Sequence, residues 1–363
     1  MTQSSVSVGA YGCDGQTESF QEAAVHTVAI LGAGPVGLWA AFMSGMHQLD
    51  CCLVDTLDQV GGQCQALYPD KPIYDIPGCP SIPAGQLVQQ LQEQVAPFRP
   101  TLYLGQTAES VVMVREDPVL FEIRTSAGAL IRCRAIVVCG GAGALIPKRP
   151  PLPQIQDFEG QSVHYFVPSG MLWENKTIVV AGGGDSAIDW TLLLAHGNNQ
   201  VHLVHRREQF SAQPHSVEQL YALVQSNRVT LHTCSQLHAL EGGDRQLTHV
   251  HIRHAQGDVR VVNADILLPC FGMHCDLGPL GQWGLVTENQ RIVINPMTGE
   301  TNIPGIYAAG DIAIYPHKLK LIMTGWAEVA QAVHHLKSYL FPDQFIPFRH
   351  STSMGSPHGW NAS

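Results

Sequence analysis

The stretch VAILGAGPVG, residues 28–37, decides the fold, because it places an apolar run directly before a glycine-rich turn. Its glycines follow the spacing GxGxxG, and the next apolar run, residues 51–54, ends in Asp55. This order predicts a strand, a tight turn, a helix and a second strand, which together form the dinucleotide-binding βαβ unit. The glycines let the backbone approach a pyrophosphate at a helix N-terminus, and the acidic strand end accepts hydrogen bonds from a ribose 2′-hydroxyl.

A second stretch of the same kind, IVVAGGGDSA, spans residues 178–187. The apolar run that follows it, residues 201–204, ends in His205, Arg206 and Arg207 instead of an acid. A basic pair at this strand end suits a 2′-phosphate. One glycine pattern also occurs as an ordinary turn in a glycine-rich chain, but two patterns with matching strands and charged strand ends are hard to obtain by accident. The sequence therefore predicts two dinucleotides, FAD at the first turn and NADPH at the second.

Length and composition agree with this prediction. A chain of 363 residues suits two or three domains, and 35 glycines indicate an α/β protein with many tight turns. The net charge of −10 argues against nucleic acid as a partner. No run approaches the roughly 20 apolar residues of a membrane span, so we expect a soluble protein.

The N-terminus and the metal-binding residue types give further expectations. Residues 1–26 are small and polar, with neither the positive end nor the apolar core of a targeting signal, and we expect a flexible tail. The ten cysteines form no CxxC pair, which is typical of a cytoplasmic protein with reduced thiols. The 18 histidines suggest metal binding, but their scatter along the chain favours no metal site.

Local patterns also outline the first half of the chain. Strands are predicted at residues 110–114, 120–125 and 130–138, as a small antiparallel meander beside a parallel sheet. A helix is predicted over residues 84–94. The proline-rich residues 146–153 cannot continue a helix or a central strand and are predicted as a linker.

The second half adds strands at residues 249–253 and 259–262 and a turn-rich crossing near residues 271–274. A last block, IPGIYAAGD at residues 303–311, precedes an amphipathic helix predicted over residues 324–340. Asp311 ends this block. It either caps a helix or, in a flavin protein, binds a ribityl hydroxyl.

Four further motifs make the chain resemble the thioredoxin-reductase-like ferredoxin–NADP⁺ reductases. They are GGQCQALYPDKPIYDIPG at residues 61–78, GGGDSAIDW at 182–190, HRRE at 205–208 and GDIAIYPHKLKLIMTGWAE at 310–328. The likeness runs from Val28 to Ser353 and includes the closing HSTS at residues 350–353. Thioredoxin reductases share the fold but carry a redox CxxC shortly before the second glycine turn, where this chain has HYFVPS, residues 164–169.

The resemblance implies an α/β fold with two Rossmann-like dinucleotide-binding domains, each a three-layer ββα arrangement, and an NADPH domain inserted into the FAD domain. The implied boundaries are an N-terminal tail at 1–26, the FAD domain at 27–148 and 273–353, the NADPH domain at 149–272 and a C-terminal tail at 354–363. The resemblance also implies a homodimer.

Site residues carry over by motif. The implied FAD contacts are Gly32, Gly34, Gly37, Asp55, Gln63, Tyr68, Ala108, Leu145, Asp311 and Thr352. The implied NADPH contacts are Gly182, Gly184, Ser186, His205, Arg206 and Arg207. Tyr68 and His350 would stack on opposite faces of the isoalloxazine ring. From the residues alone, Tyr68 could equally be a core aromatic and His350 a solvated loop residue.

The chain departs from the family pattern at two positions. Leu145 replaces a phenylalanine beside the flavin, and Ser211 stands where an arginine is expected, which leaves the 2′-phosphate to the basic pair. Cys64 lies where disulfide reductases place the first cysteine of a flavin-proximal pair, but the partner position holds Pro69. Since a lone thiol cannot form that disulfide, packing is the favoured role for Cys64.

These observations predict an FAD-dependent oxidoreductase that moves electrons between NADPH, which delivers a hydride to flavin N5, and a one-electron carrier such as ferredoxin or flavodoxin. One alternative is an NADPH-dependent disulfide reductase of the thioredoxin type. Another is a flavin-binding regulatory protein without turnover.

Overall fold

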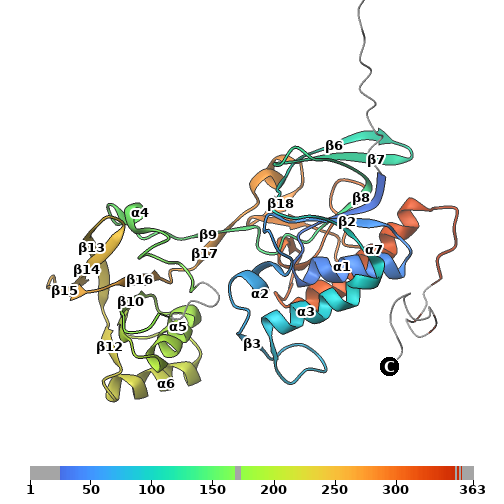
Figure 1. Cartoon of the computed structure of the whole chain (residues 1–363). Coiled ribbons are helices and arrows are strands. Elements are labelled where there is room, and N and C mark those ends of the chain that lie inside the picture. Colours follow the sequence, from blue (N-terminus) through green and yellow to red (C-terminus); the bar gives the residue numbers. More distant parts are fainter. Residues whose placement is uncertain (1–24, 168–172, 348–349, 351–352, 354–363) are drawn as a thin grey trace, which may run out of the picture.

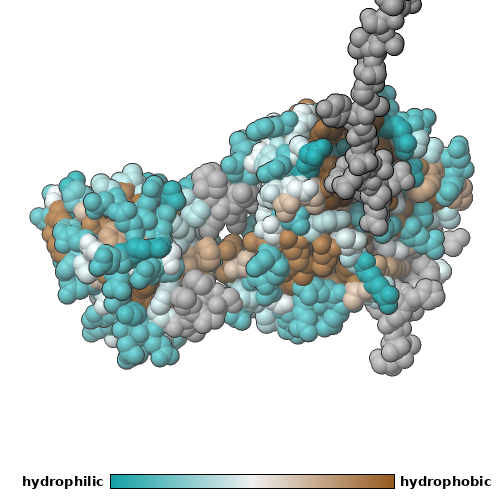
Figure 2. All heavy atoms as spheres, turned by 45° about the horizontal axis from the view of Figure 1, so that its top comes forward, coloured by the Kyte–Doolittle hydropathy of each residue, from teal (hydrophilic) through white to brown (hydrophobic). Residues whose placement is uncertain are grey.

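The computed structural model describes residues 25–167 and 173–347, together with residues 350 and 353. Figure 1 shows two units joined by a narrow two-stranded connection. The connection pairs β9 (Ala144–Pro147) with β17 (Met273–Asp276) in antiparallel register. On the face drawn in Figure 2, apolar residues gather between the two units and over the middle of the larger unit, while much of the rest of this face is hydrophilic.

The larger unit is built on a seven-stranded sheet in the order β5-β2-β1-β8-β7-β6, with β20 also paired to β8. Its strands are β1 (Val25–Leu31), β2 (Cys51–Val54), β5 (Thr101–Tyr103), β6 (Ala108–Glu116), β7 (Val119–Thr125), β8 (Leu130–Val138) and β20 (Ile306–Ala308). Because β20 comes from late in the chain, both ends of the sequence build this unit.

The strands predicted as a meander are confirmed, but β8 has a wider role than predicted. On one edge it pairs with β1 in parallel register. On its other edge, its first half pairs antiparallel with β7 and its second half pairs parallel with β20. The continuously buried run Ala135–Val138 explains this central position, because a strand covered on both faces is apolar throughout.

Helices cover one side of the parallel strands of this sheet, while the β6–β7 end of the same sheet lies on the other side of those strands (Figure 1). The helices are α1 (Pro35–Met46), α2 (Gly62–Ala66), α3 (Ala84–Val95) and α7 (Ile322–Leu340). Helix α1 packs between α3 and α7. Two indole hydrogen bonds of 3.1 Å join α1 to α7: the Trp39 ring donates to Trp326 O, and the Trp326 ring donates to Pro35 O.

Short elements complete the larger unit. They are β3 (Pro72–Ile73), β4 (Ile82–Pro83), β18 (Thr287–Glu288), β19 (Arg291–Val293), β21 (Ala313–Ile314) and the 3₁₀ turns η1 (Ala96–Phe98), η2 (Gly278–Gln282) and η3 (Gly310–Ile312).

The smaller unit has a parallel sheet in the order β12-β11-β10-β16 and an antiparallel sheet in the order β13-β14-β15. The parallel strands are β10 (Thr177–Ala181), β11 (Gln200–Val204), β12 (Val229–His232) and β16 (Ile266–Pro269). The antiparallel strands are β13 (Ser235–Gly243), β14 (Gln246–His254) and β15 (Val259–Asn263). The helices are α4 (Ile155–Phe158), α5 (Asp185–His196) and α6 (Pro214–Gln225).

Alternation along β10 explains the layers of the smaller unit. Ile178 and Val180 pack into one core with α5 and α6, whereas Val179 and Ala181 pack into a second core with the antiparallel sheet. Successive side chains of a strand point to opposite faces, so one strand serves both cores. The smaller unit is therefore a three-layer arrangement around a parallel sheet. Together with the mixed sheet of the larger unit, this confirms the predicted α/β fold with two Rossmann-like units.

The predicted linker ends inside this smaller unit. Its first residues lie in β9, and Leu152 is buried in the core beneath the antiparallel sheet. Among the described residues, no helix combines the length and apolarity needed to cross a membrane.

Candidate cofactor-binding sites

The first glycine turn leads directly into α1. Gly32 has φ +107°, and a Cβ there would meet the carbonyl of Cys139; a Cβ on Gly37 would meet the carbonyl of Gly32. Gly34 is the N-cap of α1 and makes no side-chain cap. The first amides of α1 are therefore left for another acceptor, which is the arrangement that binds a phosphate.

Two other chain segments reach the same edge of the sheet. Cys139 N donates to Leu31 O at 2.7 Å, and Ala309 N donates to Val138 O at 3.0 Å. The turns after β1, β8 and β20 thus lie together, because the carboxyl ends of neighbouring parallel strands share one edge. Ligands of open α/β sheets bind at this edge.

Asp55 supports the glycine turn itself. Its Oδ2 accepts a hydrogen bond from Ala33 N at 2.6 Å, and its Oδ1 accepts one from Leu57 N at 2.9 Å. A carboxylate has about four lone-pair positions, so these two bonds leave capacity for a ribose hydroxyl.

The motif GGQC closes over the first turn. Gly61 N donates to Ala33 O at 2.8 Å, and a Cβ on Gly62 would lie 3.0 Å from the Cα of Gly34. Gln63 reaches the turn after β8, because its Nε2 lies 3.5 Å from the Cβ position of Gly141. The side chain of Gln63 is thus held at the edge where the three turns meet.

Tyr68 is half-buried against the core of the larger unit. Burial, the neighbouring Cys64 and the charge of Asp311 raise the pKa of the Tyr68 hydroxyl. The ring therefore lies near the turn that carries Asp311.

Cys64 is almost fully buried, with 4% of its surface exposed. Burial raises the pKa of its thiol, against a smaller opposing effect of the hydrogen bond with Tyr68. Reactive cysteines have a lowered pKa, so this environment favours packing. All the cysteines whose side chains the structure describes are free.

Asp311 lies in η3, immediately after β20, and is half-buried. The helix-cap alternative is wrong, because α7 begins only at Ile322 and its N-cap is Leu321. No side-chain hydrogen bond or ion pair of Asp311 occurs within the described part of the chain. Because a half-buried carboxylate needs hydrogen-bond donors, Asp311 is a candidate ligand for hydroxyl groups.

The second glycine turn repeats this geometry in the smaller unit. Gly184 is the N-cap of α5 without a side-chain cap, and Ser186 is exposed in the first turn of the helix. A Cβ on Gly182 would lie 2.6 Å from Cys270 O. Here too, helix amides are left for a ligand.

His205 packs beneath this second turn. Its ring occupies the space that a Cβ on Gly183 would need, stacks on Phe210 with a centroid distance of 4.9 Å, and its Nε2 lies 3.0 Å from Gln209 O. Ser211, the residue found where an arginine was expected, donates its hydroxyl to Gly183 O at 3.1 Å. Both residues therefore shape the turn.

Arg206 and Arg207 are exposed at the end of β11. Neither guanidinium forms an ion pair within residues 25–167 and 173–347. They are free to bind an added phosphate, which arginine does through paired N–H groups.

The remaining predicted residues are less well placed. Ala108 is half-buried at the start of β6, and His350 is exposed, with its carbonyl accepting from Ser353 N at 2.8 Å. The side chain of Leu145 and all of Thr352 lie outside the described residues. In the part of the chain that the structure describes, no cluster of three or more metal-ligating side chains is arranged around an ion.

Sequence patterns did not reveal two charged residues beside the first site. Glu328 and Lys318 have side chains only 5% and 6% exposed, and they form an ion pair behind the turn of Asp311. The sequence signal that could have revealed this pair was Glu328, a charged residue on the buried face of α7 between Gly325 and Val329.

Comparison with known proteins identifies the family of this chain. The pyridine nucleotide-disulphide oxidoreductase family matches residues 26–335. A protein of Rickettsia felis named ferredoxin--NADP reductase is 46% identical over 330 residues, covering 90% of this chain and 98% of the relative. One of the same name from Rickettsia akari is 45% identical over 326 residues, covering 90% and 97%.

Solved structures show the same fold. Thioredoxin reductase of Lactococcus lactis superposes with a TM-score of 0.72 at 22% identity, covering 87% of this chain and 99% of that one. The bacillithiol disulfide reductase of Staphylococcus aureus gives a TM-score of 0.69 at 19% identity, covering 88% and 99%. This chain belongs to the pyridine nucleotide-disulphide oxidoreductase family, in the group of its ferredoxin–NADP reductase relatives.

Proposed function

We propose that this protein is an FAD-dependent oxidoreductase that exchanges electrons between NADPH and a one-electron carrier, either ferredoxin or flavodoxin. One contrast carries this proposal. Helices α1 and α5 both begin without a side-chain cap. The acids Asp55 and Asp311 lie beside the start of α1, whereas Arg206 and Arg207 lie beside the start of α5. This contrast distinguishes a ribose hydroxyl from a 2′-phosphate. The relatives named ferredoxin--NADP reductase support the same assignment.

The residues fit FAD at the first site. A Cβ on Gly32 or Gly37 would collide with neighbouring backbone, Gly34 is the N-cap of α1, and α1 offers free amides to a pyrophosphate. We assign hydroxyl binding to Asp55 and Asp311 and an amide contact to Gln63, with Ala108, Leu145 and Thr352 completing the site. Tyr68 and His350 are proposed to cover the two faces of the flavin ring.

NADPH is assigned to the second site in the same way. Gly182, Gly184 and Ser186 line the start of α5, and His205 supports the turn. Arg206 and Arg207 bind the 2′-phosphate.

The chain's contribution to the reaction is positioning. A bound flavin supplies the exchange between a hydride and single electrons. The two glycine turns hold the pyrophosphates, the strand-end charges select the riboses, and aromatic stacking limits water around the ring. The protein works by orienting two rings.

We further propose domain boundaries at 27–148 and 273–353 for FAD and 149–272 for NADPH, and a homodimer in the cytoplasm. The division into domains is supported by the family resemblance and by strands from both halves of the chain meeting in one sheet. The homodimer rests on the resemblance alone, and the cytoplasmic location on the cysteines without a CxxC pair.

Turnover with defined acceptors tests the function. Purified protein with NADPH should reduce ferredoxin or flavodoxin under anaerobic conditions, with NADH as a much poorer donor. Turnover of thioredoxin without turnover of either carrier would favour the disulfide reductase alternative. A yellow protein that NADPH never bleaches would favour the regulatory alternative.

A further inference from the structure

A buried ion pair lies behind the proposed FAD site. Glu328 is on α7, and its carboxylate accepts from three donors: Gly310 N at 2.8 Å, the Tyr315 hydroxyl at 2.8 Å and the Lys318 ammonium. Both charged side chains are buried, with 5% of Glu328 and 6% of Lys318 exposed. All three donors belong to residues 310–318, so one carboxylate holds this whole segment.

Such a pair is costly to build. Removing two charges from water costs several kcal/mol per ion, and a well-packed apolar pair is often at least as stable. Burial and the Glu328 carboxylate raise the pKa of Tyr315 to about 12, so this hydroxyl stays a donor at neutral pH. Stability alone therefore does not account for the network.

The location of the network indicates its use. Gly310 N is the amide that precedes Asp311, and Gly310 has φ +80°, which a glycine adopts without strain. Around it, the Cβ position of Gly310 lies 3.2 Å from Val36, and the Cβ position of Gly325 lies 3.1 Å from the Cα of Gly310. The turn is thus held between the start of α1 and the buried face of α7.

We propose that Glu328 is a positioning residue for the flavin site, which fixes the backbone of Gly310 so that Asp311 points to a bound ribityl chain. The proposal rests on the proposed function, since it requires FAD at this edge. Lys318 balances the charge of Glu328 and ties residues 315–318 to the same carboxylate.

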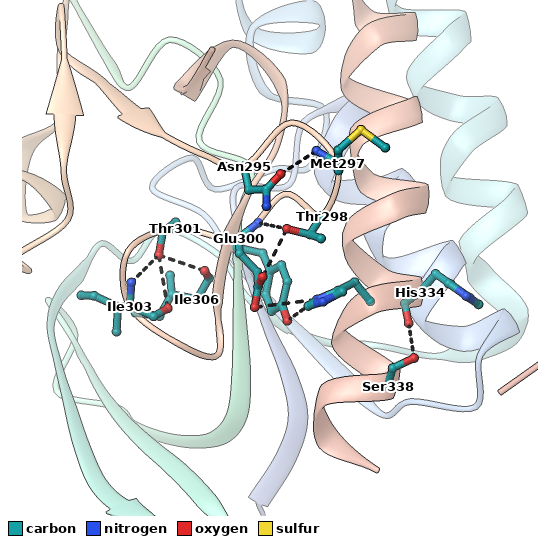
Figure 3. A network of polar contacts seen from close by, with 11 residues as sticks. Asn295, Met297, Thr298, Glu300, Thr301, Ile303, Ile306, His334 and Ser338 are labelled. Carbon is teal, nitrogen blue, oxygen red and sulfur yellow. Dashed lines mark hydrogen bonds and ion pairs between the residues drawn. The ribbon is translucent and has the colours of Figure 1, made fainter. Parts of the chain in front are cut away.

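The same helix offers a matched control. Tyr307 of β20 and Glu300 both contact His335 of α7, with 3.1 Å from the Tyr307 hydroxyl and 3.7 Å from Glu300 to Nδ1 of the ring. Figure 3 shows Glu300 within this group of polar contacts beside α7. This second network joins α7 to β20 without touching Gly310. Tyr307→Phe therefore shows how much the loss of a different contact between α7 and β20 changes the FAD affinity, the melting temperature and the flavin midpoint potential.

Two double variants remove the charges of both Lys318 and Glu328. They differ only in whether the side chain at position 328 can accept a hydrogen bond. Lys318→Met/Glu328→Gln keeps an amide oxygen for Gly310 N, whereas Lys318→Met/Glu328→Met removes it. We expect the Gln variant and Tyr307→Phe to keep FAD affinity within about threefold of the native protein, and the Met variant to lose about tenfold or more. Dissociation constants from flavin fluorescence and melting temperatures of the holoenzyme give both readouts.

A single variant covers the case in which the double Met variant does not fold. Glu328→Gln leaves the Lys318 charge buried without its counter-ion, and a nearby positive charge favours electron uptake. We expect a more positive flavin midpoint potential than in Tyr307→Phe. Equal FAD affinities in the two double variants, or an unchanged potential in Glu328→Gln, would overturn the proposal. If the native protein bound no flavin, the proposed function itself would fail, which the first titration shows separately.

Discussion

At the scale of single residues, we propose that the two arginines after β11 provide the selectivity between nucleotides. Both are exposed and unpaired within the described segments, while His205 beside them is occupied with Gly183 and Phe210. A guanidinium binds a phosphate through fixed, paired N–H groups, and a hydroxyl in that position offers no charge to bind. We therefore expect discrimination between NADPH and NADH to depend on Arg206 and Arg207.

Arg206→Ala should raise the KM for NADPH about tenfold and leave the KM for NADH within twofold, because only NADPH carries the 2′-phosphate. Steady-state kinetics with both donors measures this. Arg253→Ala, which removes an exposed arginine from β14, serves as the control. Equal effects of Arg206→Ala on both donors would show that the phosphate lies elsewhere.

At the scale of elements, a histidine pair joins two strands of the smaller unit. His202 of β11 and His232 of β12 stack with a centroid distance of 5.3 Å, and their ring nitrogens lie 3.0 Å apart. Burial, His202 and Arg260 lower the pKa of His232 to about 4. The folded sheet therefore contains the neutral form of this ring.

This lowered pKa predicts how stability depends on pH. An unfolded histidine takes up its proton near pH 6.5, so protonation favours unfolding as the pH falls from about 6.5 to about 4. The contribution of His232 to the free energy of unfolding should fall by about 2 kcal/mol as the pH is lowered from 7.5 to 5. In His232→Gln, hydrogen exchange of the β11 and β12 amides should depend correspondingly less on pH than in the native protein.

His215→Gln, at an exposed position of α6, is the control and should match the native protein at both pH values. An unchanged pH dependence in His232→Gln would mean that the ring is protonated in the folded state.

At the scale of the whole molecule, an ion pair joins the two units beside both proposed sites. Lys71 Nζ lies 2.9 Å from Asp189 Oδ2, and the two side chains are 55% and 38% exposed. Lys71 donates its backbone N–H to Tyr68 O, and Asp189 lies on α5. Within residues 25–167 and 173–347, no other side-chain hydrogen bond or ion pair is recorded between the units. The pair links the segment that carries Tyr68, proposed to stack on the flavin, to helix α5, proposed to bind NADPH.

An exposed pair contributes less than about 1 kcal/mol, so it biases the arrangement of the units without locking it. Lys71→Glu should change the small-angle X-ray scattering profile, and 0.5 M salt should shift the native profile in the same direction, since salt screens exposed charges over about one Debye length. The swap Lys71→Asp/Asp189→Lys should restore the native profile at low salt. A profile insensitive to both salt and Lys71→Glu would show that other contacts set the arrangement.

Sequence patterns predicted the elements around both sites well, because their signals are local. The strand, turn and helix of each glycine motif follow from adjacent residues, and Gly32 at φ +107° has the backbone that the motif requires. The role of β8 was predicted only in part. Its second half pairs with β20, which lies far along the chain, and no local pattern names that partner.

The sequence by itself determined two dinucleotide-binding turns and the opposite charges at their strand ends, since spacing within a few residues sets both features. Only the tertiary structure decided what surrounds them: Glu328 and Lys318 behind Asp311, His205 beneath Gly183, and Lys71 against Asp189. These contacts join residues from different elements. Their energies depend on burial and distance, which arise only when the sheets have formed and the two ends of the chain have met.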